Sequence, residues 1–198
     1  MKTMERIYFS LKRTPVEENK DLDGNKLLGS PVMPEGFLES LKLEEGDYFV
    51  AQIACASLPS RPPFPNKGYI YVFLNIDSLK PKVFFTEEEP AELIDDINSS
   101  FDEDACGDPT CLRMEIGGEE GSYLFGDVNM DIGLEGSTYL GGKLTLLEID
   151  GFDIEKAGQE SLAFGNYGMR GGHWTFLIKE ADLAKGDFSK VEFVESED

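Results

Sequence analysis

The stretch Gly46–Ile76, GDYFVAQIACASLPSRPPFPNKGYIYVFLNI, decides the fold of this chain. It contains two apolar segments, Tyr48–Cys55 and Tyr69–Ile76, which are rich in β-branched and aromatic residues and too short to span a membrane. A proline-rich connector joins them, and proline neither continues a helix nor donates a backbone hydrogen bond to a sheet. The stretch therefore predicts two buried strands joined by a stiff loop, with the rest of the chain packed on them.

Shorter strand signals lie on both sides of this pair. We expect further strands at residues 5–11, 82–86, 111–116, 122–125, 144–150, 173–178 and 187–194. The glycine-rich residues 117–121 predict that the strands at 111–116 and 122–125 form a hairpin. Short helical turns are expected within 36–46 and 179–185.

The best helix candidate is the acidic segment 87–97. Pro90 suits the first turn of a helix, and the glutamates Glu87–Glu89 suit the positive end of the helix dipole. Long crossover helices are missing from the sequence pattern, so a doubly wound parallel sheet is not expected. The predicted fold class is α+β, dominated by strands in mostly antiparallel sheets, with two or three short helices.

Length and composition predict one folded domain. At 198 residues the chain is long enough to bury a substantial core. Its 40% hydrophobic content, with 14 Phe and 7 Tyr, favours a folded domain over a disordered acidic tail. We expect a single domain over residues 1–198, with an acidic middle segment at 87–135. Charges interrupt the apolar N-terminal residues and the three cysteines are an odd number, which together predict a cytoplasmic location.

Net charge is the strongest compositional signal. The chain has 18 basic and 39 acidic residues, a net charge of −21, and its segment 87–135 has 16 acidic residues against one basic residue, Arg113. A field of this sign repels phosphate backbones, so nucleic acid is not an expected partner. No apolar run approaches the roughly 20 residues of a spanning helix, so no membrane is expected either. The charge either attracts a cationic protein or only keeps this protein soluble.

Several motifs in this order resemble the YwqG-like family of uncharacterised bacterial proteins. The family's Gly-x-Pro-x-x-Pro element corresponds to residues 29–34, its "aQI" strand to Val50–Ile53, and its "lP…G" element leading to an "fF" strand to residues 64–74. Its C-terminal pattern corresponds to 146–150, 164–168, 175–178 and 182–191. The resemblance implies a shared fold, and because some members are proposed to be immunity proteins, it also implies that role as an expectation here.

Few residues suggest a catalytic pocket. His173 is the one histidine of the chain and lies beside Trp174, and no Gly-x-Ser-x-Gly elbow is present to position a serine. A structural histidine is the simpler interpretation. Gln52 is the one polar residue in the central apolar strand, and a buried amide must find hydrogen-bond partners. It is expected to hold the proline-rich connector, or alternatively to line a pocket with Arg170, His173 and Trp174.

Metal-ligating residues do not occur at the spacings of established sites. Zinc would require all three cysteines and the single histidine, two of those cysteines being Cys106 and Cys111. The segment Asp127–Asp131 places oxygen ligands at alternate positions but lacks the glycine and glutamate that complete a calcium loop. Asp102–Asp104 with Asp108 is a second acidic cluster. No metal and no other cofactor is predicted.

The leading hypothesis is a cytoplasmic binding protein that docks a basic protein through an acidic surface, such as a bacterial immunity protein that blocks a basic toxin. The predicted contact residues are Glu87, Glu88, Glu89, Asp95, Asp96, Asp102, Glu103 and Asp104. The alternative is a small-molecule or metal-dependent enzyme with a cleft near Gln52, Arg170, His173 and Trp174. A third hypothesis is a structural domain whose acidity only confers solubility.

Overall fold

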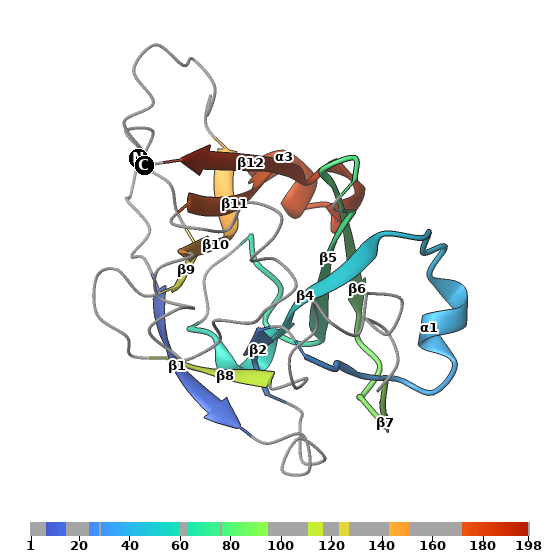
Figure 1. Cartoon of the computed structure of the whole chain (residues 1–198). Helices are drawn as coiled ribbons and strands as arrows, with labels where there is room; N and C mark the ends of the chain where they lie inside the picture. Colours follow the sequence, from blue (N-terminus) through green and yellow to red (C-terminus); the bar gives the residue numbers. More distant parts are fainter. Residues whose placement is uncertain are drawn as a thin grey trace.

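The structure of this chain is a computed structural model that describes residues 7–14, 24–27, 29–59, 63–75, 77–94, 111–116, 123–126, 143–150 and 172–197. Ten strands form one sheet in the order β12-β11-β10-β9-β1-β8-β2-β4-β5-β6, and each neighbouring pair is antiparallel. Their bounds are β1 Ile7–Thr14, β2 Lys26–Leu27, β4 Asp47–Ala54, β5 Tyr69–Asn75, β6 Lys80–Thr86, β8 Cys111–Ile116, β9 Tyr123–Gly126, β10 Lys143–Asp150, β11 Gly172–Lys179 and β12 Glu192–Glu197 (Figure 1).

The remaining elements are short. A two-stranded antiparallel sheet pairs β3 (Val32–Met33) with β7 (Glu92–Leu93). Two four-residue α-helices, α1 (Phe37–Ser40) and α3 (Glu180–Leu183), lie within the segments where short helical turns were predicted. Two 3₁₀ turns, η2 (Cys55–Ser57) and η5 (Phe188–Lys190), complete the described part of the chain. The prediction of a strand-dominated, antiparallel architecture with short helices is confirmed, and the described residues are mostly β.

The two central strands predicted from the sequence are β4 and β5, which pair antiparallel from Asp47↔Asn75 to Ala54↔Tyr69. All residues of both strands are buried. Along β5, Ile70, Val72 and Leu74 point into one apolar cluster, the larger core, and the alternate residues between them point into a second cluster, the smaller core. Since both faces of β4 and β5 are covered, their sequences are continuously apolar instead of alternating.

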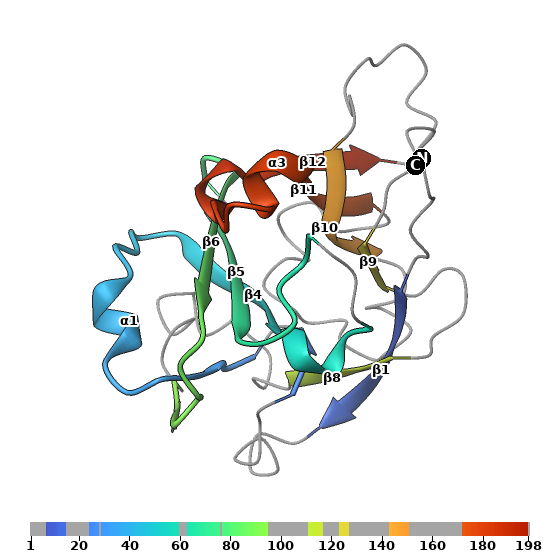
Figure 2. The same ribbon diagram turned by 180° about the vertical axis from the view of Figure 1, so that it is seen from behind.

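The larger core joins the two ends of the chain. It contains Val50 and Val72 from the central strands together with Leu146 and Phe176 from β10 and β11. The sheet curves so that its last strands approach one another, since β6 contacts both β12 and η5. Figures 1 and 2 show the segment around α3 beside the end of the β5–β6 hairpin. The expected shared interior between N-terminal and C-terminal strands is therefore present.

The smaller core lies on the opposite face of β4 and β5, where the segment around α1 covers it. Met33 and Leu41 are buried there against Phe49 and Phe73. Phe37 of α1 packs on Tyr71 with ring centroids 5.6 Å apart. The apolar residues at helical spacing in 36–46 thus form a lid over the outer face of the sheet.

The predicted helix at 87–97 is wrong over the part that the structure describes. Residues 87–91 have no helical structure, and β7 pairs with β3 through Val32↔Leu93. The Ala91 N–H donates to the Met33 carbonyl at 2.8 Å, and the Ile94 N–H donates to the Pro31 carbonyl at 2.9 Å. Pairing with β3 satisfies the backbone of this segment and packs Ile94 against the smaller core.

Two further expectations are corrected by the sheet order. Strands β8 and β9 do not form a hairpin, because β1 lies between them and pairs with both. The C-terminal strand begins at Glu192 instead of 187, since residues 188–190 form η5, in which Phe188 is buried. The 3₁₀ turn lets the ring of Phe188 stack on Phe85 of β6 at a centroid distance of 5.5 Å.

Candidate functional site

The acidic run, residues Glu87–Glu89, directly follows edge strand β6 and leads into β7. All three side chains are exposed. The Glu88 N–H donates to Thr86 Oγ1 at 3.1 Å, which fixes the backbone as it leaves the strand. The other residues predicted to contact a partner lie outside the described residues: Asp95, Asp96, Asp102, Glu103 and Asp104.

Two side chains near the start of β5 contact the acidic run. Lys67 Nζ lies 2.5 Å from Glu87 Oε2, and the Tyr69 hydroxyl donates to Glu89 Oε2 at 3.0 Å. Both members of the Lys67–Glu87 pair are more than half exposed, so the pair adds little stability. The run therefore presents carboxylates to solvent on a backbone that is tied to β6 and β7.

Gln52 is fully buried, as predicted, and residues 60–62 of the proline-rich connector lie outside the described residues. Its Oε1 accepts from the Val32 N–H at 2.9 Å, and its Nε2 donates to the Gly24 carbonyl at 3.2 Å. Both partners belong to the segment that precedes β4 in sequence. The amide is thus a structural clamp for residues 24–32.

Gln52→Leu is expected to lower the free energy of unfolding by about 2 kcal/mol, because it leaves a buried N–H and a buried carbonyl without their partner. Chemical denaturation of both proteins measures the difference. Asn25 is the control residue. Its side chain also accepts a hydrogen bond from a backbone N–H of β4, that of Ala54, but it contacts the exposed Ser57 as well. A Gln52→Leu protein as stable as the wild type would contradict the clamp.

The other predicted pocket residues are distributed differently. Trp174 points into the larger core, is 2% exposed, and donates from Nε1 to Glu195 Oε1 at 3.0 Å. His173 is the neighbouring residue on β11, so its side chain points to the opposite face of the sheet. Arg170 lies outside the described residues. Gln52 is on β4, separated from β11 in the sheet order by β2, β8, β1, β9 and β10, so the described contacts do not bring Gln52, His173 and Trp174 together.

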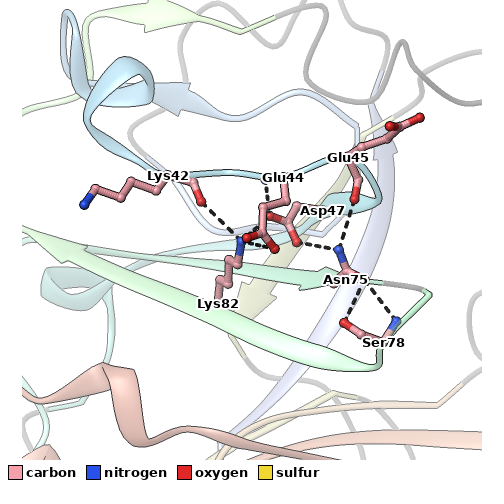
Figure 3. Close-up of polar contacts among 7 residues, drawn as sticks. All are labelled: Lys42, Glu44, Glu45, Asp47, Asn75, Ser78 and Lys82. Atoms are coloured by element: carbon pink, nitrogen blue, oxygen red, sulfur yellow. Dashed lines mark hydrogen bonds and ion pairs between the residues drawn. The ribbon is translucent and has the colours of Figure 1, made fainter.

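A polar cluster that sequence reasoning missed lies where β4 begins. Asp47 and Lys82, 35 residues apart, form an ion pair of 2.6 Å between β4 and β6 (Figure 3). The Asp47 side chain is completely buried, and that of Lys82 is 24% exposed. We call this group the Asp47 cluster, and its members are Lys42, Glu44, Glu45, Asp47, Asn75, Ser78 and Lys82.

Hydrogen bonds satisfy Asp47 on both carboxylate oxygens. Its Oδ2 accepts from the Glu44 N–H at 2.6 Å as well as from Lys82, and its Oδ1 accepts from Asn75 Nδ2 at 2.9 Å. Burial by itself would raise the pKa of Asp47, but the hydrogen bonds from Lys82, Glu44 and Asn75 outweigh it and hold the pKa below its usual value. Burial would lower the pKa of Lys82, but its hydrogen bonds to Asp47 and Glu44 raise it. The pair is therefore ionised at neutral pH.

The Asp47 cluster also fixes the turn between β5 and β6. Asn75 Nδ2 donates to the Glu45 carbonyl at 3.2 Å in addition to Asp47. Asn75 Oδ1 accepts from the backbone N–H of Ser78 at 3.0 Å and from its hydroxyl at 2.8 Å. One buried carboxylate thus anchors the amide that holds the turn.

Among the described residues no group of three or more His, Cys, Asp or Glu side chains could hold a metal ion. The predicted zinc and calcium candidates Cys106, Asp102–Asp104, Asp108 and Asp127–Asp131 lie outside that part of the chain. Cys55 is buried, and desolvation raises its pKa to about 12. Its thiol stays protonated at neutral pH, which makes it a poor nucleophile and a poor metal ligand.

No protein-family model matches this chain, and no curated protein matches it. The similarity to the YwqG-like family therefore rests on the motifs quoted above. In the described ranges, no helix has the length and apolar character needed to cross a membrane.

Proposed function

We propose that this chain is a cytoplasmic binding protein that docks a basic protein through its acidic middle segment. The main support for the proposal is the acidic run, in which three exposed carboxylates follow an edge strand. The run belongs to segment 87–135, whose sequence has 16 acidic residues and one basic residue. Complementary charge of this size accelerates association and makes it sensitive to salt.

The backbone of the acidic run supports a binding role. Strand β6 precedes it, β7 follows it, and Tyr69 and Thr86 contact it directly. A partner can therefore bind carboxylates carried on a backbone that is already ordered, which reduces the entropy lost on association. The resemblance to the YwqG-like family makes a bacterial immunity protein that blocks a basic toxin the concrete form of the proposal.

The triple variant Glu87→Gln, Glu88→Gln, Glu89→Gln is expected to weaken partner binding about tenfold at low salt, because each exposed carboxylate contributes a fraction of a kcal/mol. Any basic proteins that prove to be encoded beside this chain's gene are the candidate partners, each purified for the test. Titration calorimetry or surface plasmon resonance at low and high salt measures the affinities.

A matched control removes the same charge elsewhere on the surface. Glu35, Glu39 and Glu45 are also exposed, and their replacement by glutamine changes the net charge equally. This control is expected to reduce affinity much less than the triple variant, because Glu35, Glu39 and Glu45 lie outside the proposed contact. The proposed function would be overturned if no candidate bound this protein, or if the binding were unaffected by salt.

A further inference from the structure

The turn between β5 and β6 has an unusual residue at its last position. Leu79 has φ +53°, the left-handed region that glycine and asparagine adopt easily and leucine does not. Its side chain is 46% exposed, and among the residues whose side chains the structure describes it is the one large hydrophobic side chain that is exposed. The left-handed backbone conformation destabilises the free protein, and the exposed side chain buries little apolar surface to offset that cost, so folding alone does not account for a leucine here.

The turn that carries Leu79 is held rigidly from inside the molecule. Asn75 binds the backbone N–H and hydroxyl of Ser78, and Asp47 and the Glu45 carbonyl bind Asn75 in turn (Figure 3). The last member of this series of hydrogen bonds is Asp47, whose carboxylate is fully buried. A side chain presented on such a support loses little conformational freedom when a partner covers it.

We propose that Leu79 is an anchor residue that inserts into an apolar pocket of the same basic protein that binds the acidic run. The inference rests on the proposed function and adds a second contact to it. The two contacts lie at opposite ends of β6, whose seven residues span about 23 Å. An interface of standard size, about 800 Å² on each partner, is wide enough to include both.

The net charge of the protein favours a cationic protein over the other partners that an exposed leucine could contact. With a net charge of −21 the protein is repelled by anionic membrane surfaces and by a second copy of itself. A cationic protein is the macromolecule that this charge attracts. An apolar pocket in such a partner would give the leucine a burial that the free protein does not provide.

The test compares Leu79→Asn and Leu79→Gly with Lys80→Gln, which changes the exposed neighbouring residue at the start of β6. Both Leu79 variants are expected to melt at the wild-type temperature or up to about 4 °C above it, because they relieve the backbone conformation. They are expected to bind the basic proteins encoded beside this chain's gene about fivefold to tenfold more weakly, and the loss should persist at high salt because the contact is apolar. Lys80→Gln should retain the wild-type affinity to within twofold.

The outcomes separate this inference from the proposed function. If the triple glutamate variant loses salt-dependent binding while both Leu79 variants bind within twofold of the wild type, the proposed function stands and the anchor is overturned. If no candidate binds in a salt-dependent manner, both fail. A change in self-association by sedimentation, or in binding to phosphatidylserine vesicles, with partner affinity unchanged would identify a different occupant and overturn the inference. A fall in melting temperature would show that Leu79 serves the fold instead.

Discussion

Asp47→Asn is expected to lower the free energy of unfolding by about 3 kcal/mol, the lower end of the range for removing one partner of a buried ion pair. The expected loss of free energy of unfolding is at the lower end of that range because Lys82 is 24% exposed and keeps its contact with Glu44 at 3.2 Å. For a chain of this length the loss corresponds to about 6–12 °C in melting temperature. Differential scanning calorimetry at neutral pH measures it.

The pH dependence of the stability difference between wild type and Asp47→Asn follows from the lowered pKa of Asp47. Since folding lowers that pKa, the stability it contributes is fully present above the unfolded carboxyl value of 3.8 and is lost as pH falls through the folded value. The raised pKa of Lys82 contributes stability that is present below 10.5 and lost as pH rises through its folded value. The gap between wild type and Asp47→Asn should therefore be constant near neutrality and shrink in strong acid.

Glu44→Gln is the matched control for this experiment. Glu44 also pairs with Lys82, but its side chain is 75% exposed, so the variant should lose less than about 0.5 kcal/mol. An Asp47→Asn protein that melts within 2 °C of Glu44→Gln would show that the buried pair does not stabilise the fold. A gap that widens in acid would contradict the direction given for the pKa of Asp47.

Phe176→Ala is expected to lower the free energy of unfolding by about 4 kcal/mol, because it removes a fully buried ring and leaves a cavity in the larger core. Phe176 packs against Phe193 with a centroid distance of 5.3 Å, and Phe193 in turn packs edge-on against Trp174. Trp174 is the only tryptophan of the chain, so its fluorescence reports the C-terminal strands directly.

The same variant tests whether the chain unfolds as one unit. Since the larger core contains strands from both ends of the chain, the loss of stability should extend to β4 and β5, which lie more than 100 residues before Phe176. Hydrogen exchange of peptides covering 47–54 and 69–75 should accelerate together with that of 143–150. Faster exchange confined to the C-terminal strands would show two independent units. Phe84→Ala, a partly buried ring on the smaller core, is the control and should cost about half as much.

Local patterns in the sequence were sufficient where burial alone decides the structure. The continuous apolar runs Tyr48–Cys55 and Tyr69–Ile76 predicted two adjacent buried strands, since short apolar runs rich in β-branched and aromatic residues favour strands covered on both faces. The burial of Gln52 could also be read from its apolar neighbours. The exposure of Glu87–Glu89 agrees with their position in a solvated acidic stretch.

Contacts between distant segments could not be read from local patterns. Over residues 87–94 the predicted helix is replaced by backbone pairing with β3, because that pairing and the partial burial of Ile94 outweigh a weak intrinsic preference. The predicted hairpin of β8 and β9 is interrupted by β1, which comes from the opposite end of the sequence. Sheet order depends on which strands share an interior, and that is a property of the whole chain.

The sequence by itself determined that this protein has a strand-rich apolar interior and an acidic middle segment, because hydrophobic patterning and net charge are properties of composition and local order. Only the tertiary structure decided that Asp47 meets Lys82, that Gln52 holds residues 24–32, and that Leu79 stands exposed in a left-handed turn. Those features arise where segments distant in sequence are brought together, since a hydrogen bond or an ion pair depends on position in space and leaves no mark in the spacing of residues along the chain.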